Sequence, residues 1–181
     1  MKKVEPIRDK EKIQEMKSIL KRQNYRDYIL FELGINSGLR ISDLLQLKVK
    51  DVKTTNTIEL KEKKTNKSKQ FGINDKVRQK LNDYITGMED NEYLFQSRKG
   101  DNKPISRTQA YRILRKAADK IGLDKVGTHT LRKTFGYHHY KQNKDVAILQ
   151  KIFNHSSPSI TKDYIGLTQE EINKSTREFY I

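Results

Sequence analysis

Apolar residues recur at helical spacing along most of this 181-residue sequence, and this pattern constrains its fold more than any other feature. Polar residues with side-chain oxygens precede several of these segments and are expected to cap them: Asp9, Asn24, Asn74, Ser106 and Ser157. The pattern predicts helices over residues 9–22, 24–38, 41–47, 74–84, 106–121, 130–141, 146–153, 158–165 and 169–181.

One stretch departs from helical spacing. Residues 57–60 and 70–73 predict two short strands that flank a tight, lysine-rich turn. No long Pro-, Gly- or Ser-rich linker divides the chain. We therefore expect one mainly α (α+β) domain with a small antiparallel β-sheet over residues 1–167. It would begin with an extended arm at residues 1–8, and a helical tail would follow at residues 168–181.

The charge balance points to a class of partner. The sequence carries 38 Lys and Arg residues against 23 Asp and Glu residues, a net charge of +15. Such a surplus favours a polyanion, which could be nucleic acid, an acidic membrane or an acidic protein. A membrane-surface helix places basic residues opposite a face of Trp, Phe and Leu, whereas this chain has no Trp and spreads its basic residues along its length. Nucleic acid is the favoured partner.

Missing residue types exclude several classes of protein. The chain has no Cys, which excludes disulfides, thiolate metal sites and a cysteine nucleophile. No apolar run reaches the roughly 18 residues of a membrane span, and the N-terminal region has no apolar signal-peptide core. We expect a cytoplasmic protein.

Two short motifs place arginines near helix ends. The sequence Gly-Leu-Arg-Ile-Ser-Asp at residues 38–43 puts Arg40 at the mouth of a turn between helices. The sequence His-Thr-Leu-Arg at residues 129–132 puts His129 and Arg132 on one helix face, because residues three apart share a face. A solvated polar surface also explains each motif taken alone.

A third motif combines a histidine, a short helix and a tyrosine. His155 precedes a Ser-Pro pair at residues 157–158, which starts a helix that Gly166 must end. Such a short helix is unstable in isolation, so Tyr164 would lie on an element held only by packing. A core tyrosine is the alternative explanation. A fourth feature is the lysine-rich turn at residues 61–69, which a solvated hairpin tip also explains.

Together and in this order, the motifs resemble the catalytic half of the tyrosine recombinase, or phage integrase, family. The resemblance extends from about Tyr25 to Gly166 and rests on the Gly-Leu-Arg-x-Ser-Asp box, the His-x-x-Arg pair and a histidine nine residues before a tyrosine. It implies the helical catalytic-domain fold of tyrosine recombinases. It also implies a site-specific recombinase that cuts and rejoins DNA through a covalent 3′-phosphotyrosine, without metal, ATP or any other cofactor.

The resemblance implies that Tyr164 is the nucleophile, Arg40 and Arg132 the paired arginines, and His129 and His155 the two histidines. These residue types suit the chemistry. A phenol has a pKa near ~10, so attack at neutral pH needs a base, which His129 could supply. Two guanidiniums offer forked, permanently charged donors to the non-bridging phosphate oxygens, and His155 would add another donor.

The resemblance also implies a lysine at the hairpin tip that protonates the departing 5′ oxygen. Lys64 is the expected residue because Lys-Thr-Asn-Lys at residues 64–67 fits the family's turn pattern, and Lys67 and Lys63 remain alternatives. Asp43 follows Arg40 by three residues and is expected to orient the basic cluster as a hydrogen-bond acceptor.

The helix predicted over residues 106–121 carries basic residues outside its apolar stripe. The family places the corresponding helix in the major groove, which implies DNA contacts by Arg107, Thr108 and Arg112, and by Lys67 of the hairpin. A generically basic outer face explains the same residues equally well.

Two features of the sequence depart from the family pattern, and a third could be mistaken for a metal site. Asn154 stands where the family usually has Gly, and Asn also tolerates a left-handed helix end. The usual N-terminal core-binding domain is missing, so we expect either a fragment or a compact natural version. His138 and His139 suggest no metal site, because neighbouring helical residues point about 100° apart. Packing is expected for His138.

Two other functions remain open, a non-catalytic DNA-binding accessory protein on the same fold and a DNA-relaxing enzyme similar to type IB topoisomerases. The expected partners are double-stranded DNA and other recombinase protomers assembled on it, with neither a membrane nor a small-molecule substrate. Ile172, Thr176 and Phe179 could form an apolar stripe for a neighbouring protomer. A bacterial or phage-encoded, nucleoid-associated protein is expected.

Overall fold

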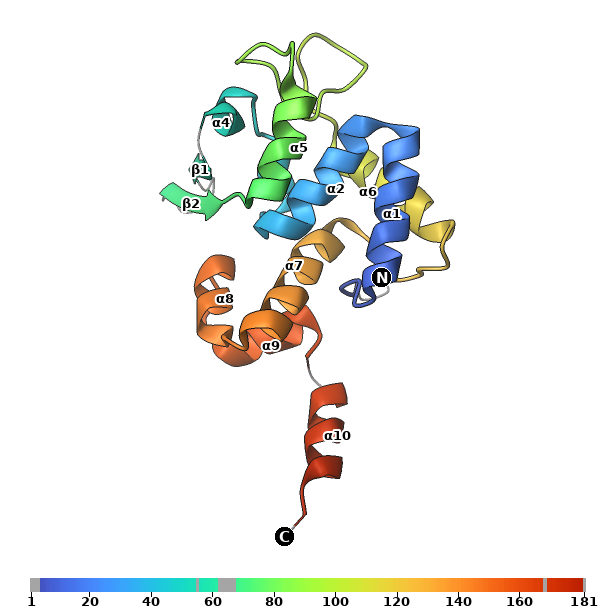
Figure 1. The fold of residues 1–181 in the computed structure, drawn as a ribbon, viewed down its shortest axis with the longest axis vertical. Helices are drawn as coiled ribbons and strands as arrows, with labels where there is room; N and C mark the ends of the chain where they lie inside the picture. Colours follow the sequence, from blue (N-terminus) through green and yellow to red (C-terminus); the bar gives the residue numbers. More distant parts are fainter. Residues whose placement is uncertain (1–3, 55, 62–67, 168, 181) are drawn as a thin grey trace.

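The computed structural model describes residues 4–54, 56–61, 68–167 and 169–180. It is mainly helical with one small antiparallel sheet, as predicted (Figure 1). The helices in these ranges are α1 (Lys10–Gln23), α2 (Tyr25–Ser37), α3 (Ile41–Leu44), α4 (Lys50–Lys53), α5 (Asp75–Ile85), α6 (Arg107–Asp119), α7 (Thr128–Asn143), α8 (Val146–Phe153), α9 (Pro158–Ile165) and α10 (Gln169–Glu178).

The predicted N-caps are confirmed. Side-chain oxygens of Asp9, Asn24, Asn74, Ser106 and Ser157 each accept a hydrogen bond from a backbone N–H in the first turn of the following helix. Each bond satisfies a donor that has no partner within the helix itself. The bounds of α8 and α9 match the predicted ranges.

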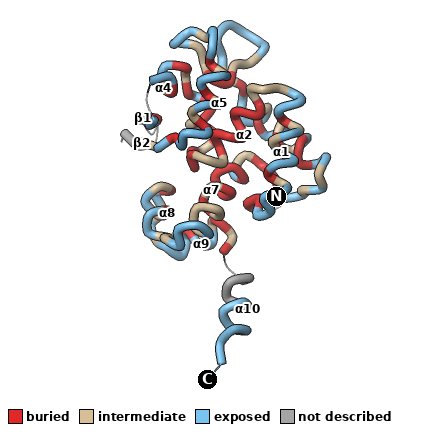
Figure 2. Tube along the Cα trace, in the orientation of Figure 1, coloured by how far each residue is buried: buried red, intermediate tan, exposed pale blue. Residues whose placement is uncertain are grey.

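Helix α2 runs through the centre of the molecule (Figure 2). Residues 27–34 are all buried, because α1, α5 and α7 pack around them. Helical spacing of apolar residues by itself accounts for one buried face. The additional buried positions arise because several elements cover α2 from different sides.

The prediction of one helix over residues 41–47 is wrong in length. Helix α3 covers only Ile41–Leu44, and a second one-turn helix, α4, follows it at Lys50–Lys53. One-turn helices are too short to produce a helical period in the sequence, so their bounds depend on tertiary packing.

The sheet is a hairpin of β1 (Thr57–Lys61) and β2 (Ser68–Gly72), with Thr57 opposite Gly72. Strand β2 begins two residues before the predicted range. The three candidate lysines of the turn, Lys63, Lys64 and Lys67, lie outside the described residues.

Two groups of buried apolar side chains hold the fold together. The large core draws on α1, α2, α5, α6 and the first half of α7. The small cluster consists of Leu149, Phe153, Ile165 and Leu167, with further residues of α7, α8 and α9 packed against it. Helix α7 runs from one group to the other, so it connects the body of the molecule to α8 and α9 (Figure 1).

The N-terminal end of the described chain packs against the body, whereas the C-terminal end extends away from it. Residues 4–8, here called the N-terminal strap, have no regular secondary structure and cross α7, where the Ile7 N–H donates to Thr134 Oγ1 at 2.9 Å. Helix α10 projects away from the body (Figure 1), and residues 174–180 are exposed. Thr176 and Phe179 of the predicted stripe are therefore exposed, while the Ile172 side chain lies outside the described part.

None of the described helices is long and apolar enough to cross a membrane.

Candidate active site

Arg40 lies in the short connection between α2 and α3. Gly38 ends α2 in the left-handed conformation, with φ +66°, and a Cβ there would lie 2.5 Å from the Phe135 ring. This turn therefore requires glycine. Arg40 is the N-cap residue of α3, and its carbonyl accepts the N–H groups of Asp43 and Leu44. The backbone on both sides of Arg40 is thus fixed.

Arg132 is buried in the middle of the site, with 5% of its surface exposed. Its two Nη atoms donate to the backbone carbonyls of Gly38 and Phe153, and its guanidinium carbon lies 4.4 Å from the centroid of the Phe153 ring. Its positive charge also acts on the Tyr164 side chain, whose pKa it lowers. A planar guanidinium can donate in several directions at once, which a lysine ammonium in this position could not match. Arg132 therefore joins the end of α2 to the end of α8.

His129 lies in the first turn of α7, one turn before Arg132, and is exposed. Partial desolvation lowers the pKa of His129, and the nearby cations Arg107, Lys133, Arg132 and Arg40 lower it further. An imidazole with a pKa below its ordinary value of 6.5 is mostly neutral at pH 7. It can therefore accept a proton.

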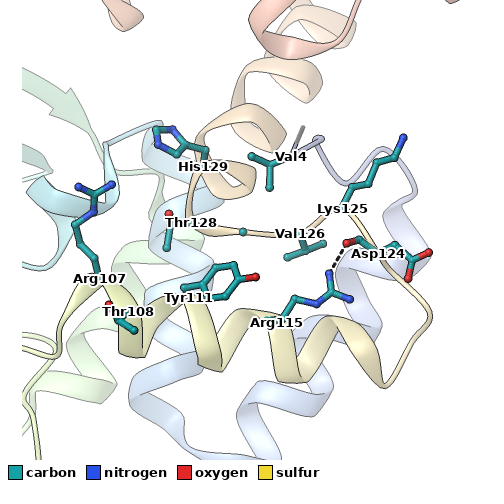
Figure 3. Close-up of a pocket in the computed structure, with 11 residues that line it drawn as sticks. Val4, Arg107, Thr108, Tyr111, Arg115, Asp124, Lys125, Val126, Thr128 and His129 are labelled. Carbon is teal, nitrogen blue, oxygen red and sulfur yellow. Dashed lines mark hydrogen bonds between the residues drawn. The ribbon is translucent and has the colours of Figure 1, made fainter. Parts of the chain in front are cut away.

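A pocket of about 670 Å³ opens beside His129, between α6 and the loop that leads into α7 (Figure 3). Arg107 and His129 lie at the same end of this pocket, and Thr108 and Tyr111 of α6 line it. At the other end, Arg115 donates to the carbonyl of Asp124 at 2.6 Å. The pocket is a basic hollow adjoining the histidine.

His155 is placed by an unusual helix end. Asn154 ends α8 in the left-handed conformation, with φ +56°, as the sequence predicted for this position. The next residue, His155, then turns its ring toward α9, where its Nδ1 lies 3.0 Å from Thr161 Oγ1. Desolvation lowers the pKa of His155, and Arg132 and Arg40 lower it further.

Tyr164 lies on the last turn of α9, between Ser157-Pro158 and Gly166. Its ring contacts His155 edge-on, with centroids 5.1 Å apart, and Phe153 at 5.4 Å. Burial raises the pKa of Tyr164, and the positive charges of Arg132 and Arg40 oppose that rise. The phenol therefore stays protonated at neutral pH.

Comparisons with known proteins bear on what this arrangement is. The sequence profile of the phage integrase family matches residues 8–171. The chain belongs to the phage integrase family. It is 53% identical over 176 residues to the probable integrase/recombinase YoeC of Bacillus subtilis (strain 168), and the match covers 97% of each protein.

Solved structures place this family member among recombinases by fold. The crystal structure of XerA recombinase superposes with a TM-score of 0.78 at 24% identity, covering 97% of this chain and 67% of XerA. XerH site-specific recombinase bound to palindromic difH substrate superposes with a TM-score of 0.74 at 20% identity, covering 97% of this chain and 54% of XerH. Likeness at these identities shows the fold alone.

Other relatives are named tyrosine recombinases, and this chain spans little more than half of their length. These comparisons confirm the predicted family and the predicted fold class. The relatives also belong to the predicted enzyme class, the recombinases. The catalytic roles of single residues stay predictions.

The structure brings most of the predicted site residues of this integrase-family chain together. His155 and Tyr164 contact each other, the charges of Arg40 and Arg132 act on both, and His129 lies within electrostatic reach of both arginines. These residues come from four segments, namely the connection between α2 and α3, the first half of α7, the connection between α8 and α9, and α9 itself.

The remaining predicted residues lie around this group. Asp43 accepts a hydrogen bond from the Ser42 hydroxyl at 3.3 Å. Arg107 and Thr108 line the pocket beside His129, whereas Arg112 is exposed further along α6. Lys64 and Lys67 lie outside the described residues.

Two neighbours of the site were not predicted. Thr161 is fully buried and contacts His155, and Lys133 is 7% exposed and lies over the Tyr164 ring. The sequence offers one weak signal for Lys133, since it directly follows Arg132. His138, expected to pack, is half-buried and its Nε2 lies 2.9 Å from the Ile7 carbonyl. The described residues contain no group of three or more His, Asp or Glu side chains placed to hold a metal.

Proposed function

We propose that this protein cuts and rejoins double-stranded DNA at specific sites, with Tyr164 as the nucleophile. The Tyr164 oxygen attacks a backbone phosphorus, a bond forms between them, and the bond from phosphorus to the 5′ oxygen breaks. The products are a 3′-phosphotyrosine and a free 5′-hydroxyl. Attack by a 5′-hydroxyl on the phosphotyrosine reverses the step, so ligation requires no ATP. The observation that carries the proposal is the convergence of Arg40, Arg132, His155 and Tyr164.

The two arginines would stabilise the charge that develops on the non-bridging oxygens. Arg132 is held by two carbonyls and the Phe153 ring, which fixes its guanidinium before DNA arrives. Arg40 projects from a turn whose backbone is fixed at Gly38. A preorganised donor does not need to reorient during the reaction, which is the main source of this kind of stabilisation.

The two histidines would have different roles, one as a proton acceptor and the other as a hydrogen-bond donor. Because the Tyr164 pKa is raised, its proton must leave during attack, and neutral His129 would accept it. His155 would donate from Nε2 to the phosphate, while the contact of its Nδ1 with Thr161 Oγ1 at 3.0 Å orients the ring. The departing 5′ oxygen takes a proton from the hairpin lysine. Lys64 is proposed for this role, with Lys67 and Lys63 as the alternatives.

The DNA partner follows from charge and from fold. The chain has a net charge of +15, and the Tn1549 transposon integrase, which has the same fold, was solved in complex with DNA. Arg107 and Thr108 of α6 would contact DNA on the side of the pocket next to His129, and Arg112 would contact it further along the helix. Asp43 would orient the basic cluster. Further protomers would assemble on the same DNA.

A covalent trap tests this proposal. DNA bound by the protein is selected from a random pool, and a nicked half-site version of it is incubated with the protein. The wild type is expected to form an adduct that survives denaturation. Tyr164→Phe should abolish the adduct, and Tyr140→Phe, which alters another tyrosine packed against the small cluster, should retain it.

Two outcomes would contradict the proposal. No adduct on DNA that the protein binds would favour a non-catalytic DNA-binding protein. An adduct that persists in Tyr164→Phe would place the nucleophile on another residue.

A further inference from the structure

Lys133 is a basic residue that the chemistry proposed above does not use. It lies on α7 directly after Arg132 and is only 7% exposed, although lysine is among the residues least often buried. Its Nζ donates to the Val4 carbonyl at 2.9 Å and lies 5.1 Å from the centroid of the Tyr164 ring. The ammonium thus stands between the N-terminal strap and the tyrosine.

The N-terminal strap, which accepts the hydrogen bond of Lys133, is itself held by several hydrogen bonds. The Ile7 N–H donates to Thr134 Oγ1, and the Ile7 carbonyl accepts from His138 Nε2, both at 2.9 Å. Arg8 then reaches the carbonyl of Gly166, two residues after Tyr164, at 3.2 Å. The strap therefore connects the face of α7 to the end of α9.

We propose that Lys133 is a positioning residue for Tyr164, an inference that rests on the proposed function. An ammonium over the face of an aromatic ring is attracted to it, and the attraction is stronger where water is excluded. Held by the Val4 carbonyl, Lys133 keeps the Tyr164 ring in its orientation against His155 and Phe153. The strap determines where the ammonium stands, so it contributes to the alignment of the nucleophile.

This role differs from that of the other basic residues near the site. Arg107 and Arg112 are exposed and can reach phosphates, whereas the burial of Lys133 prevents such contact. A phosphate contact adds to the dependence of DNA affinity on salt concentration. Loss of Lys133 should therefore slow cleavage without changing DNA affinity or its salt dependence.

The test compares Lys133→Met, which keeps the length of the side chain and removes the charge, with Lys133→Arg, which keeps a cation. Lys141→Met is the matched control, because Lys141 is also on α7, with its Nζ 5.4 Å from the Tyr137 ring centroid, but is exposed. Single-turnover cleavage of half-site DNA, DNA affinity across a salt series and the melting temperature are measured for each variant.

Lys133→Met is expected to cleave about 20-fold more slowly than the wild type. DNA affinity should be unchanged, Lys133→Arg should recover much of the rate, and Lys141→Met should match the wild type. Three results would overturn the inference: a rate for Lys133→Met within about twofold of wild type, a weaker salt dependence of binding, or equal losses of rate in the Met and Arg variants.

A second measurement separates this inference from the proposed function. In spectra of the protein with isotope-labelled tyrosine, the Tyr164 resonance is assigned by its loss in Tyr164→Phe. Lys133→Met should shift that resonance, and Lys141→Met should shift Tyr137 instead. A wild type that forms no adduct but shows this response would contradict the proposed function and leave the positioning supported. No shift of Tyr164 would overturn the positioning whether or not the protein cleaves DNA.

Discussion

The large core and the small cluster hold the residues of the site in different ways. The large core surrounds α2 and supports the turn that carries Arg40 and the α7 turn that carries His129. The small cluster has four buried apolar residues and holds the two eight-residue helices beside His155 and Tyr164. The groups that would bind and activate the phosphate thus lie mainly on the well-packed region, and the nucleophile lies on the sparsely packed one.

This difference shows where the site is vulnerable. Regions with few buried contacts open locally at a lower cost in free energy than the rest of the fold. Arg132 links the two regions, because it donates both to Gly38 at the end of α2 and to Phe153 at the end of α8. A change at Arg132 should therefore affect geometry and chemistry together, whereas changes inside one region should affect mainly one of them.

The largest effect is expected for Arg132→Lys, because one ammonium cannot replace the three contacts of the guanidinium. The cleavage rate should fall by about 10³-fold, and the unsatisfied carbonyls should lower the free energy of unfolding by about 1–3 kcal/mol. Single-turnover cleavage and denaturant unfolding measure the two quantities.

Arg26→Lys is the control, since Arg26 joins Asp27 to the Gln96 carbonyl within the body. It should lower stability but leave cleavage per folded molecule near that of the wild type. Equal losses of cleavage in the two variants would contradict the linking role of Arg132.

A smaller effect is expected from adding a methyl group at Gly136, on the face of α7 that meets the small cluster. A Cβ there would lie 2.5 Å from Ile165 Cγ2 and 2.7 Å from Phe153 Cζ, so α9 must shift. Misplacing a reacting group by about 1 Å can cost about 100-fold in rate, and Gly136→Ala should lose about that much cleavage.

Gly34→Ala makes the corresponding change in the large core, where the new Cβ would meet Leu131 Cδ1 at 2.6 Å. It should lower the free energy of unfolding by about 1–3 kcal/mol, with a smaller loss of cleavage per folded molecule. Gly72→Ala adds a Cβ that meets nothing within 4 Å and serves as the neutral variant. A Gly136→Ala protein that cleaves like Gly72→Ala would show that α9 tolerates displacement.

The smallest effect concerns pH. The His129 pKa lies below 6.5, so the imidazole is already mostly neutral at pH 7. The cleavage rate should therefore fall only when the pH drops toward the lowered pKa and the imidazole becomes protonated. Arg107→Gln removes one of the cations that lower this pKa, so the acid limb should move to higher pH. The change in rate at pH 6 should be less than about tenfold.

The rate is measured with protein saturating the DNA, because Arg107 is also proposed to contact DNA. The His155 pKa is lowered by Arg132 and Arg40 but not by Arg107, so any limb due to His155 should stay in place. An unchanged profile in Arg107→Gln would argue against His129 as the base.

Much of the site could be predicted from local sequence. The Ser-Pro and Gly that bound α9, and the Asn154 that ends α8, set backbone conformations through their own stereochemistry. The positions of His155 and Tyr164 follow from these ends. Helices α3 and α4 could not be placed from sequence, because single turns carry no period.

The burial of individual polar residues was also beyond prediction. A lysine is expected at the surface. Lys133 is buried because the N-terminal strap, more than a hundred residues earlier in the chain, lies over it and accepts its hydrogen bond. The fully buried Thr161 gains its role from His155, which lies on the preceding connection. Contacts between distant segments determine such roles, and a local pattern does not contain them.

The most direct test of the site is to identify the residue that becomes joined to DNA. After trapping, nuclease and trypsin digestion, mass spectrometry locates the nucleotide remnant. Cleavage after Lys162 and Lys174 releases peptide 163–174, in which Tyr164 is the only tyrosine. We expect the remnant on this peptide as a 3′-phosphotyrosine. A remnant on the peptide that contains Tyr137 and Tyr140, or on any other residue, would contradict convergence of the arginines and histidines on Tyr164.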